Sequence, residues 1–455
     1  MAEDGIVRAL REAIAPEVIC TDAATLDLLA HDALHPSRFP SGTTLARPVC
    51  VVRPQTTAQV AAVLRFANTV ICPVIPMGGG SGLMGGAASI VPGIVLDLCQ
   101  LNAIRLRPAD RMAEVGAGAT ISALNQAAAP HGLMCGHDPW TVAVATVGGT
   151  ISTNSLGYLG GKYGAMGHQV LGLEVVLPSG DMVQTRGVEK SSTGPALPPL
   201  FIGAEGCLGI ITQATLRLIP VPQKRVLQAW TFADFATGFA AINALFDAGI
   251  RPGLLDYGDE DPAPETTTPA TLMIGYEGPA RVAQAEAEEA AAICVQHQGQ
   301  LQPAQHAASF WHERHARGDA YARARTAGQP WRRARPQFDY LHVALPPSAV
   351  LQYRRDSLER LYGHGFTAHQ TGLWDHAGLF SLSYSSPSEA RRAEVHEALL
   401  KHCQDLQGSM EYCHGVGTRL APLMWREHGA GLDVLRRLKQ SLDPHGILNP
   451  GKLGL

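Results

Sequence analysis

Short apolar runs and amphipathic segments alternate through the first half of the chain. Residues 47–54, 94–98 and 112–115 have the length and apolar composition of buried strands. Apolar positions recur at helical spacing in residues 6–15, 57–68 and 120–130, and the Thr56 hydroxyl is placed to cap the second of these helices. Helix and strand alternate without an internal repeat, which predicts a domain of the α+β class.

From about residue 220 the pattern changes to repeated strand–helix–strand units. It predicts strands at residues 225–230, 253–257 and 271–276 and helices at residues 234–248 and 280–296. The expected product is a second α+β unit, an antiparallel sheet covered by helices on one side. A last helix is predicted over residues 432–442, before a turn rich in Pro and Gly.

Composition narrows the possible functions. The chain has 455 residues and a net charge of −4, which allows two or three domains and gives no basic surplus for a nucleic-acid partner. No apolar run is long enough to span a bilayer, and the first residues lack the basic start of a secretory signal. The nine scattered cysteines contain no C-x-x-C pair, which argues against a zinc knuckle, an iron–sulfur cluster or a disulfide framework. These features predict a cytoplasmic protein with reduced thiols.

Residues 76–86, P-M-G-G-G-S-G-L-M-G-G, form the most unusual stretch of the chain. Six glycines in eleven residues let backbone N–H groups turn inward and admit a bulky anion, so the stretch is interpreted as a phosphate cradle. A flexible linker is the alternative, but the apolar run of residues 70–75 leads directly into the glycines. The G-x-G-x-x-G match from Gly80 to Gly85 is interpreted as accidental, because no helix follows it as a Rossmann site requires.

Two further stretches combine small residues, hydroxyls and glycines where a plain strand would alternate. They are residues 135–155, with Ala145-Thr146-Val147-Gly148-Gly149, and residues 201–212, with the run G-A-E-G-C-L-G-I-I-T. Such composition indicates that the backbone approaches something flat or bulky.

Together these three motifs resemble the FAD-binding domain of the vanillyl-alcohol oxidase superfamily, also called PCMH-type. Within it the pattern is similar to the glycolate oxidase D-subunit and D-2-hydroxyacid dehydrogenases, and less closely to alkyldihydroxyacetonephosphate synthase, over residues 45–222 and 400–455. The resemblance implies an N-terminal helical segment (1–45), a two-lobed FAD-binding domain (46–222), a cap domain that contacts substrate (223–440) and a tail that returns to the FAD domain (441–455).

The resemblance also implies bound FAD and the residues that surround it. The expected cofactor residues are Pro76, Met77, Gly78, Gly79, Gly80, Ser81, Gly82, Pro139, Trp140, Thr141, Ala145, Thr146, Gly148, Gly149, Ser152, Thr153, Asn154, Ser155, Glu205, Gly206, Gly209, Ile210, Ile211 and Asn449. Non-covalent binding is expected, because the glycine stretch carries no His or Cys where some relatives attach the flavin. Cys135 and His137 are the nearest alternatives for a covalent bond, although burial or loop hydrogen bonding explains both residues as well.

Catalytic candidates come from chemistry and resemblance together. A neutral histidine suits removal of a hydroxyl proton, and His414 lies in Y-C-H-G-V-G, which matches the family's E-H-G-V-G in all but its first position. Arg314, in W-H-E-R, resembles the family's W-x-x-R and is the candidate clamp for a substrate carboxylate, with a solvated helix arginine as the alternative. Tyr340 takes the place of a lysine found in some relatives, which argues against a dicarboxylate substrate. His369 lies in a segment similar to the synthase.

A catalytic metal is not expected. Metal-dependent relatives carry G-H-x-G-D-G-N-x-H followed by E-H-G, but here His376 is the one matching ligand, with Ser383 and Cys413 in the other two positions. One histidine does not make a metal site.

These features predict an FAD-dependent oxidoreductase. It is expected to oxidise a 2-hydroxy acid of the D-lactate or glycolate type, or a related alcohol, by hydride transfer to flavin N5 with His414 as base and an unidentified electron acceptor. One alternative is a synthase-like flavin transferase. The other is a flavin-binding subunit of an electron-transfer complex, and a homodimer is a further possibility.

Overall fold

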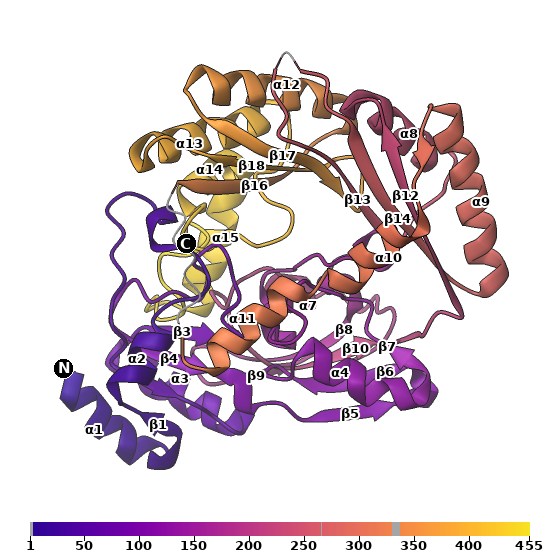
Figure 1. Cartoon of the computed structure of the whole chain (residues 1–455). Helices are drawn as coiled ribbons and strands as arrows, with labels where there is room; N and C mark the ends of the chain where they lie inside the picture. The colour runs from indigo at the N-terminus through magenta and orange to yellow at the C-terminus, as the bar shows by residue number, and fades with distance from the viewer. Residues whose placement is uncertain (1–2, 265, 330–336) are drawn as a thin grey trace.

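Four sheets organise the chain. The computed structural model describes residues 3–264, 266–329 and 337–455, which fold into two lobes with the longest sheet in the upper lobe of Figure 1. The mixed α+β class predicted from the sequence is confirmed. No helix in these ranges has both the length and the apolar character needed to cross a membrane.

The glycine stretch follows a strand of the small sheet in the lower lobe. Strands β2, β4 and β3 are parallel, and β1 pairs with β2 in antiparallel fashion. Helix α3 crosses from β2 to β3 and buries Val60, Val63 and Leu64 against the sheet. The predicted cap of α3 is confirmed, because the Gln59 N–H donates to the Thr56 hydroxyl at 3.3 Å. The elements here are α1 (Glu3–Ala13), β1 (Ile19–Cys20), α2 (Ala23–Leu29), β2 (Cys50–Val52), α3 (Thr57–Val70), β3 (Val74–Met77) and β4 (Ile94–Asp97).

A five-stranded antiparallel sheet, in the order β5-β6-β10-β8-β9, completes the lower lobe. Helix α5 packs its buried Val147 and Ile151 into the same core as Val115 and Ala214 of this sheet. The elements are β5 (Ile104–Arg107), β6 (Met112–Gly116), α4 (Ile121–Ala128), β7 (Leu133–Met134), α5 (Val147–Ser152), α6 (Gly160–Tyr163), β8 (Val170–Val176), β9 (Met182–Gln184), α7 (Pro198–Phe201), β10 (Ile210–Arg217) and β11 (Ile219–Pro220), the last paired with β7.

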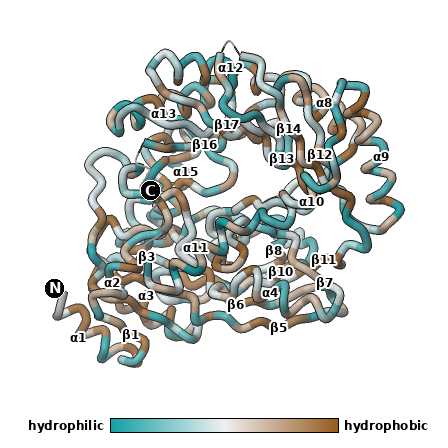
Figure 2. Tube along the Cα trace, in the orientation of Figure 1, coloured by the Kyte–Doolittle hydropathy of each residue, from teal (hydrophilic) through white to brown (hydrophobic). Residues whose placement is uncertain are grey.

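The upper lobe is a seven-stranded sheet in the order β15-β12-β14-β13-β17-β18-β16, and all of its pairings are antiparallel. In Figure 1 the helices α12 and α13 lie along the top of this sheet and α8 and α9 along its right-hand side, so helices cover the sheet as predicted. Figure 2 shows hydrophobic and hydrophilic residues alternating along α9 and α13, as expected of helices with one buried face. The elements are β12 (Lys224–Phe232), α8 (Phe235–Asp247), β13 (Leu254–Glu260), β14 (Ala270–Gly278), α9 (Ala280–Gln296), β15 (Gln300–Leu301), β16 (Phe338–Ala344), α12 (Pro347–Gly363), β17 (Thr367–Trp374), β18 (Leu379–Ser385) and α13 (Glu389–Asp405).

Two segments join the lobes. Helices α10 (Ala304–Glu313) and α11 (Ala316–Thr326) run obliquely from the upper lobe across the lower one in Figure 1. After α14 (Met424–His428) and α15 (Ala430–Leu442), the chain returns to the small sheet, where Leu448 bridges Val74 of β3. Both segments bring residues from the second half of the chain to the glycine stretch.

Candidate active site

The glycine stretch begins at the end of β3 and turns tightly back on itself. Gly80 has φ +66°, in the left-handed region that glycine adopts at low cost. A Cβ on Gly79 would collide with the Val144 carbonyl, and a Cβ on Gly78 would collide with the Thr146 hydroxyl. Larger residues at these positions would therefore push the backbone away from the segment that faces it.

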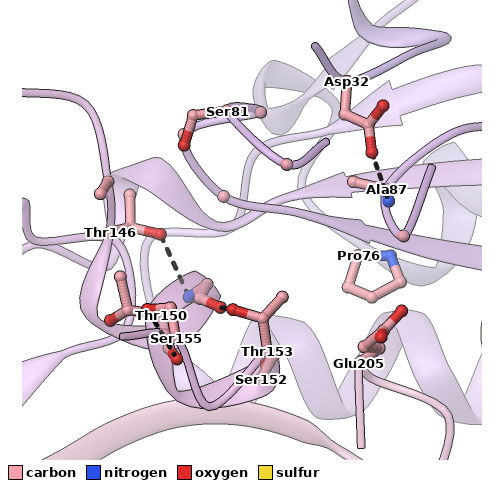
Figure 3. A pocket seen from close by; sticks show the side chains of 18 of the residues that line it. Asp32, Pro76, Ser81, Ala87, Thr146, Thr150, Ser152, Thr153, Ser155 and Glu205 are labelled. Carbon is pink, nitrogen blue, oxygen red and sulfur yellow. Dashed lines mark hydrogen bonds between the residues drawn. The ribbon is translucent and has the colours of Figure 1, made fainter. Parts of the chain in front are cut away.

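One pocket contains nearly all the residues expected to hold FAD. Every predicted cofactor residue lines it except Asn154 and Asn449. Thr146 caps α5, whose Gly149 N–H donates to the Thr146 hydroxyl at 3.3 Å, and this bond is drawn in Figure 3. The figure also shows the hydroxyls of Ser152, Thr153 and Ser155 grouped at this helix. Small residues, a glycine cradle and hydroxyl donors lining one pocket fit a dinucleotide with a pyrophosphate at its middle.

The two exceptions hold neighbouring loops in place. Asn154 has φ +47° and accepts the Gly167 N–H at 2.9 Å through its side-chain oxygen. Asn449 donates from Nδ2 to the carbonyls of Gly86 (2.8 Å) and Glu205 (2.7 Å), so it joins the C-terminal tail to two of the pocket loops.

Sequence reasoning did not single out several residues of the pocket as cofactor contacts. They are Asp32, Ala87, Leu98, Ala117, Thr150, Leu156 and Cys413, whereas Leu83, Met84 and Gly86, which also line the pocket, belong to the stretch interpreted as a phosphate cradle. Asp32 lies in an irregular segment without a motif, and burial raises its pKa to about 6. Its carboxylate accepts the N–H groups of Leu34 (3.0 Å) and Ala87 (3.4 Å), and Figure 3 draws the bond from Ala87.

Neither alternative for covalent flavin attachment lines the pocket. His137 is buried and its Nε2 lies 2.9 Å from the Ser155 hydroxyl, so it supports the turn that follows α5. Burial lowers the pKa of His137 to about 4, which keeps the ring neutral. Cys135 is also buried.

Glu205 connects the cofactor pocket to the loop that carries His414. Its Oε1 accepts the N–H groups of Val416 (2.6 Å) and Gly417 (3.1 Å), and its Oε2 accepts the Gly417 N–H at 2.9 Å. A Cβ on Gly415 would overlap the same carboxylate, so the close contact depends on that glycine. Burial raises the pKa of Glu205 to about 7.

His414 lines the pocket at the tip of this loop, where Glu411 supports it. Glu411 Oε1 accepts the N–H groups of Tyr412, Cys413 and His414 at 2.7–3.1 Å and lies 3.4 Å from His414 Nδ1. Burial alone would lower the pKa of His414, but Cys413 and the Glu411 carboxylate raise it well above its usual value. Both neighbours therefore favour the protonated form of the imidazole.

A second histidine contacts His414. The rings of His342 and His414 lie 4.6 Å apart in a T-shaped arrangement, and burial followed by the His414 charge lowers the pKa of His342 to about 3. Ligand atoms of His342, Glu411 and His414 all lie within 4.8 Å of one another, the one such group in the part of the chain described. This group contains neither His376 nor Ser383, and sequence spacing did not reveal it because His342 comes from a distant strand.

The other catalytic candidates lie away from the pocket lining. Arg314 is bound to Asp138 (Nε to Oδ2, 2.9 Å) and donates to the Trp311 carbonyl at 2.6 Å. His376, in the turn between β17 and β18, accepts the Gly378 N–H and packs 4.7 Å from the Phe246 ring. His369 lies 2.6 Å from the Ser385 hydroxyl and stacks on Phe338. Of the four candidates, only His414 reaches the pocket.

Helix α11 lies over the glycine stretch. The Tyr321 hydroxyl donates to the Gly80 carbonyl at 2.6 Å, and Arg325 packs against Gly80. Gly318 lies so close to the Trp140 carbonyl that a Cβ would collide with it. The helix therefore covers part of the glycine stretch with residues from the second half of the chain.

Comparison with known proteins places these features in a family. Residues 48–186 match the model of the FAD binding domain, and residues 221–453 match the C-terminal domain of FAD linked oxidases. The chain is 32% identical to D-lactate dehydrogenase of Archaeoglobus fulgidus, covering 89% of this chain and 90% of the relative. It is 29% identical to glycolate oxidase subunit GlcD of Bacillus subtilis, covering 89% of each.

Solved structures agree at the level of the fold. An alkyldihydroxyacetonephosphate synthase matches with a TM-score of 0.75 and 20% identity, covering 98% of this chain and 84% of its own. A p-cresol methylhydroxylase with substrate bound matches with a TM-score of 0.76 and 17% identity, covering 99% and 96%. At these identities the likeness concerns the fold alone.

Proposed function

The chain belongs to the family of FAD-linked oxidases, and from this premise we propose that it oxidises a 2-hydroxy acid of the D-lactate or glycolate type, or a related alcohol. FAD is its cofactor. The pocket residues described above are the ones that would hold FAD without a covalent bond, and the bound flavin supplies the acceptor for the substrate's hydride at N5.

The observation that carries the proposal is the position of His414 in the cofactor pocket, on a glycine-rich loop held by Glu205. Oxidation of a carbinol requires loss of the hydroxyl proton, and a histidine is the side chain best suited to accept it. Glu411 lies on the Nδ1 side of His414, so we assign proton uptake to Nε2. The ring must first lose its own proton, which makes the reaction faster as pH rises.

Other residues of this chain exclude water and fix the reacting groups. Helix α11 covers the glycine stretch through Tyr321, and the ion pair of Arg314 with Asp138 holds α10 and α11 against the loop of residues 137–139. In this geometry Arg314 acts on the position of the loop, because its Nε and one terminal nitrogen are already bonded within the protein.

The test is anaerobic reduction of the flavin by a panel of D- and L-2-hydroxy acids. We expect one acid to bleach the visible flavin band of the parent protein. His414→Gln should retain FAD and lose at least about 100-fold in reduction rate, the range of a general base. His364→Gln, an exposed histidine at the end of α12, is the matched control and should reduce at the parent rate. Flavin reduction at the parent rate in His414→Gln would refute the assignment of the base.

A further inference from the structure

Three largely buried arginines surround one carboxylate near His414. Asp339 on β16 lies 2.7 Å from Arg419, 3.5 Å from Arg38 and 3.5 Å from Arg392. The exposed fractions of these arginine side chains are 4%, 10% and 2%. They come from three distant parts of the chain, so the fold gathers them at one place.

The cluster carries more positive than negative charge. Asp339 is the one carboxylate that forms an ion pair with these arginines among the residues described, and Arg419 in particular lowers its pKa against the effect of burial. His396, bonded to Arg419 at 2.9 Å, adds no charge because burial and the Arg419 charge lower its pKa to about 3. Buried charges without partners are costly, so a group of this kind calls for an anion.

Two donors of the cluster lack a partner within the described chain. They are one terminal nitrogen of Arg419 (NH1) and the Tyr340 hydroxyl. The guanidinium carbons of Arg38 and Arg419 lie 4.7 and 5.5 Å from the centre of the Tyr340 ring. The unused donors therefore belong to one small neighbourhood around Tyr340.

This neighbourhood borders the active site. The rings of Tyr340 and His414 are 6.0 Å apart, and His414 lines the cofactor pocket. The backbone N–H of Arg419 donates to the carbonyl of Met84, another residue of the pocket lining. An anion held here would lie next to the histidine that faces the flavin.

We propose that Arg419 and Tyr340, with Arg38 behind them, bind a single carboxylate of the substrate while its carbinol faces His414. The inference rests on the proposed function for the identity of the substrate. It replaces Arg314 as the carboxylate clamp, because the Arg314 guanidinium is bound to Asp138 and to the Trp311 carbonyl, whereas Arg419 keeps one terminal nitrogen without a hydrogen-bond partner among the described residues. A guanidinium and a phenol are suitable donors for one carboxylate, since both give directed hydrogen bonds to its oxygens.

The test uses a ligand that cannot be oxidised. Propanoate has the carboxylate without a hydroxyl, and propanamide has the same shape without charge. Binding of both to the FAD-bound protein is measured by ligand-observed NMR in the millimolar range. We expect saturable binding of propanoate alone, weakened about 10-fold or more in Arg419→Met and about 3- to 10-fold in Tyr340→Phe, the range of a lost charge-assisted hydrogen bond. Tyr353→Phe, whose hydroxyl bonds Leu399 in the upper lobe, should bind like the parent.

Equal binding of propanoate and propanamide, or parent-like affinity for propanoate in both variants, would overturn the proposal. If Arg419→Met fails to fold, Tyr340→Phe decides. Propanoate binding with no flavin reduction by any hydroxy acid would support the anion site and refute the proposed function. Flavin reduction with unchanged KM in both variants would refute the site and leave the function standing.

Discussion

The charge of Glu411 favours the protonated form of His414. Its Oε1 is held by three backbone N–H groups, so the carboxylate stays in place beside Nδ1. A histidine stabilised as a cation is a poor base until it is deprotonated. If His414 is the base, as proposed, Glu411 also shifts the pH at which it can act.

Glu411→Gln should move the pH dependence of flavin reduction. Glutamine keeps a side-chain oxygen for the three N–H groups and removes the charge that raises the pKa of His414. In the parent, reduction accelerates as pH rises through that raised pKa, because the neutral ring is the active form. In the variant we expect the same rise at a pH lower by about 1 unit or more, the effect of losing a close opposite charge. The measurement is kcat/KM across pH 5–10.

Glu427→Gln is the control for this shift. Glu427 accepts the Met410 N–H at 3.3 Å at the start of the same loop, so the variant removes a charge nearby without touching His414. The pH profile of kcat/KM in Glu427→Gln should coincide with that of the parent. A profile of Glu411→Gln that coincides with the parent would show that Glu411 does not control the base.

Metal removal should leave the reaction unchanged. His342, Glu411 and His414 have suitable ligand atoms, but Glu411 Oε1 already accepts three N–H bonds and lies 3.4 Å from His414 Nδ1. We expect protein dialysed against EDTA to reduce its flavin at the parent rate. Stoichiometric zinc in the purified protein would contradict this expectation if chelation removed the zinc together with the activity, and if His342→Ala bound less zinc than the parent.

At the scale of elements, helix α11 covers the glycine stretch and contacts it through Tyr321. Tyr321→Phe removes the hydroxyl that donates to the Gly80 carbonyl and keeps the buried ring. We expect the Kd for FAD to rise about 5-fold, since a hydrogen bond of this kind contributes about 1 kcal/mol. The measurement is the Kd for FAD by fluorescence on reconstitution of the apoprotein.

Tyr362→Phe gives the comparison for that variant. Its hydroxyl donates to the Pro262 carbonyl at 3.0 Å on the upper lobe, so the same chemical change is made away from FAD. Equal FAD affinity in both variants and the parent would show that α11 does not retain the cofactor through Tyr321.

Periodic elements were predictable from the sequence and contacts between distant elements were not. The helix over residues 280–296 agrees with α9, and the absence of a helix after the glycines is confirmed, because residues 81–93 are irregular before β4. Helix α5 was missed because Gly148 and Gly149 weaken the local helical signal, while its stability comes from the capping Thr146 and tertiary packing. His342 contacts His414, and Arg419 approaches it through Tyr340. Both contacts depend on the strand order and on the path of the loop that follows, which cannot be read from a single sequence.

At the scale of the whole molecule, the last residues of the chain hold together loops that line the pocket. Lys452 is fully buried and donates to the Ala88 carbonyl at 3.0 Å. Burial lowers its pKa to about 8, with the charges of Asp32 and Glu205 among the groups acting in the opposite direction. The tail thus brings a cation and a side-chain amide to loops that lie hundreds of residues earlier.

Asn449→Gly tests whether this return holds the pocket together. Asn449 has φ +43°, which glycine tolerates, so the variant removes the side chain without forcing the backbone. The carbonyls of Gly86 and Glu205 then lose their shared donor inside the protein, at a cost of about 1–3 kcal/mol. Because both carbonyls belong to pocket residues, we expect lower resistance to urea and an affinity for FAD lower by about 10-fold. Asn243→Ala removes one comparable bond, to the Phe239 carbonyl on α8, and should lower stability without changing FAD affinity. If Asn449→Gly affected stability alone in the same way, the tail would be a support for the fold and not for the cofactor site.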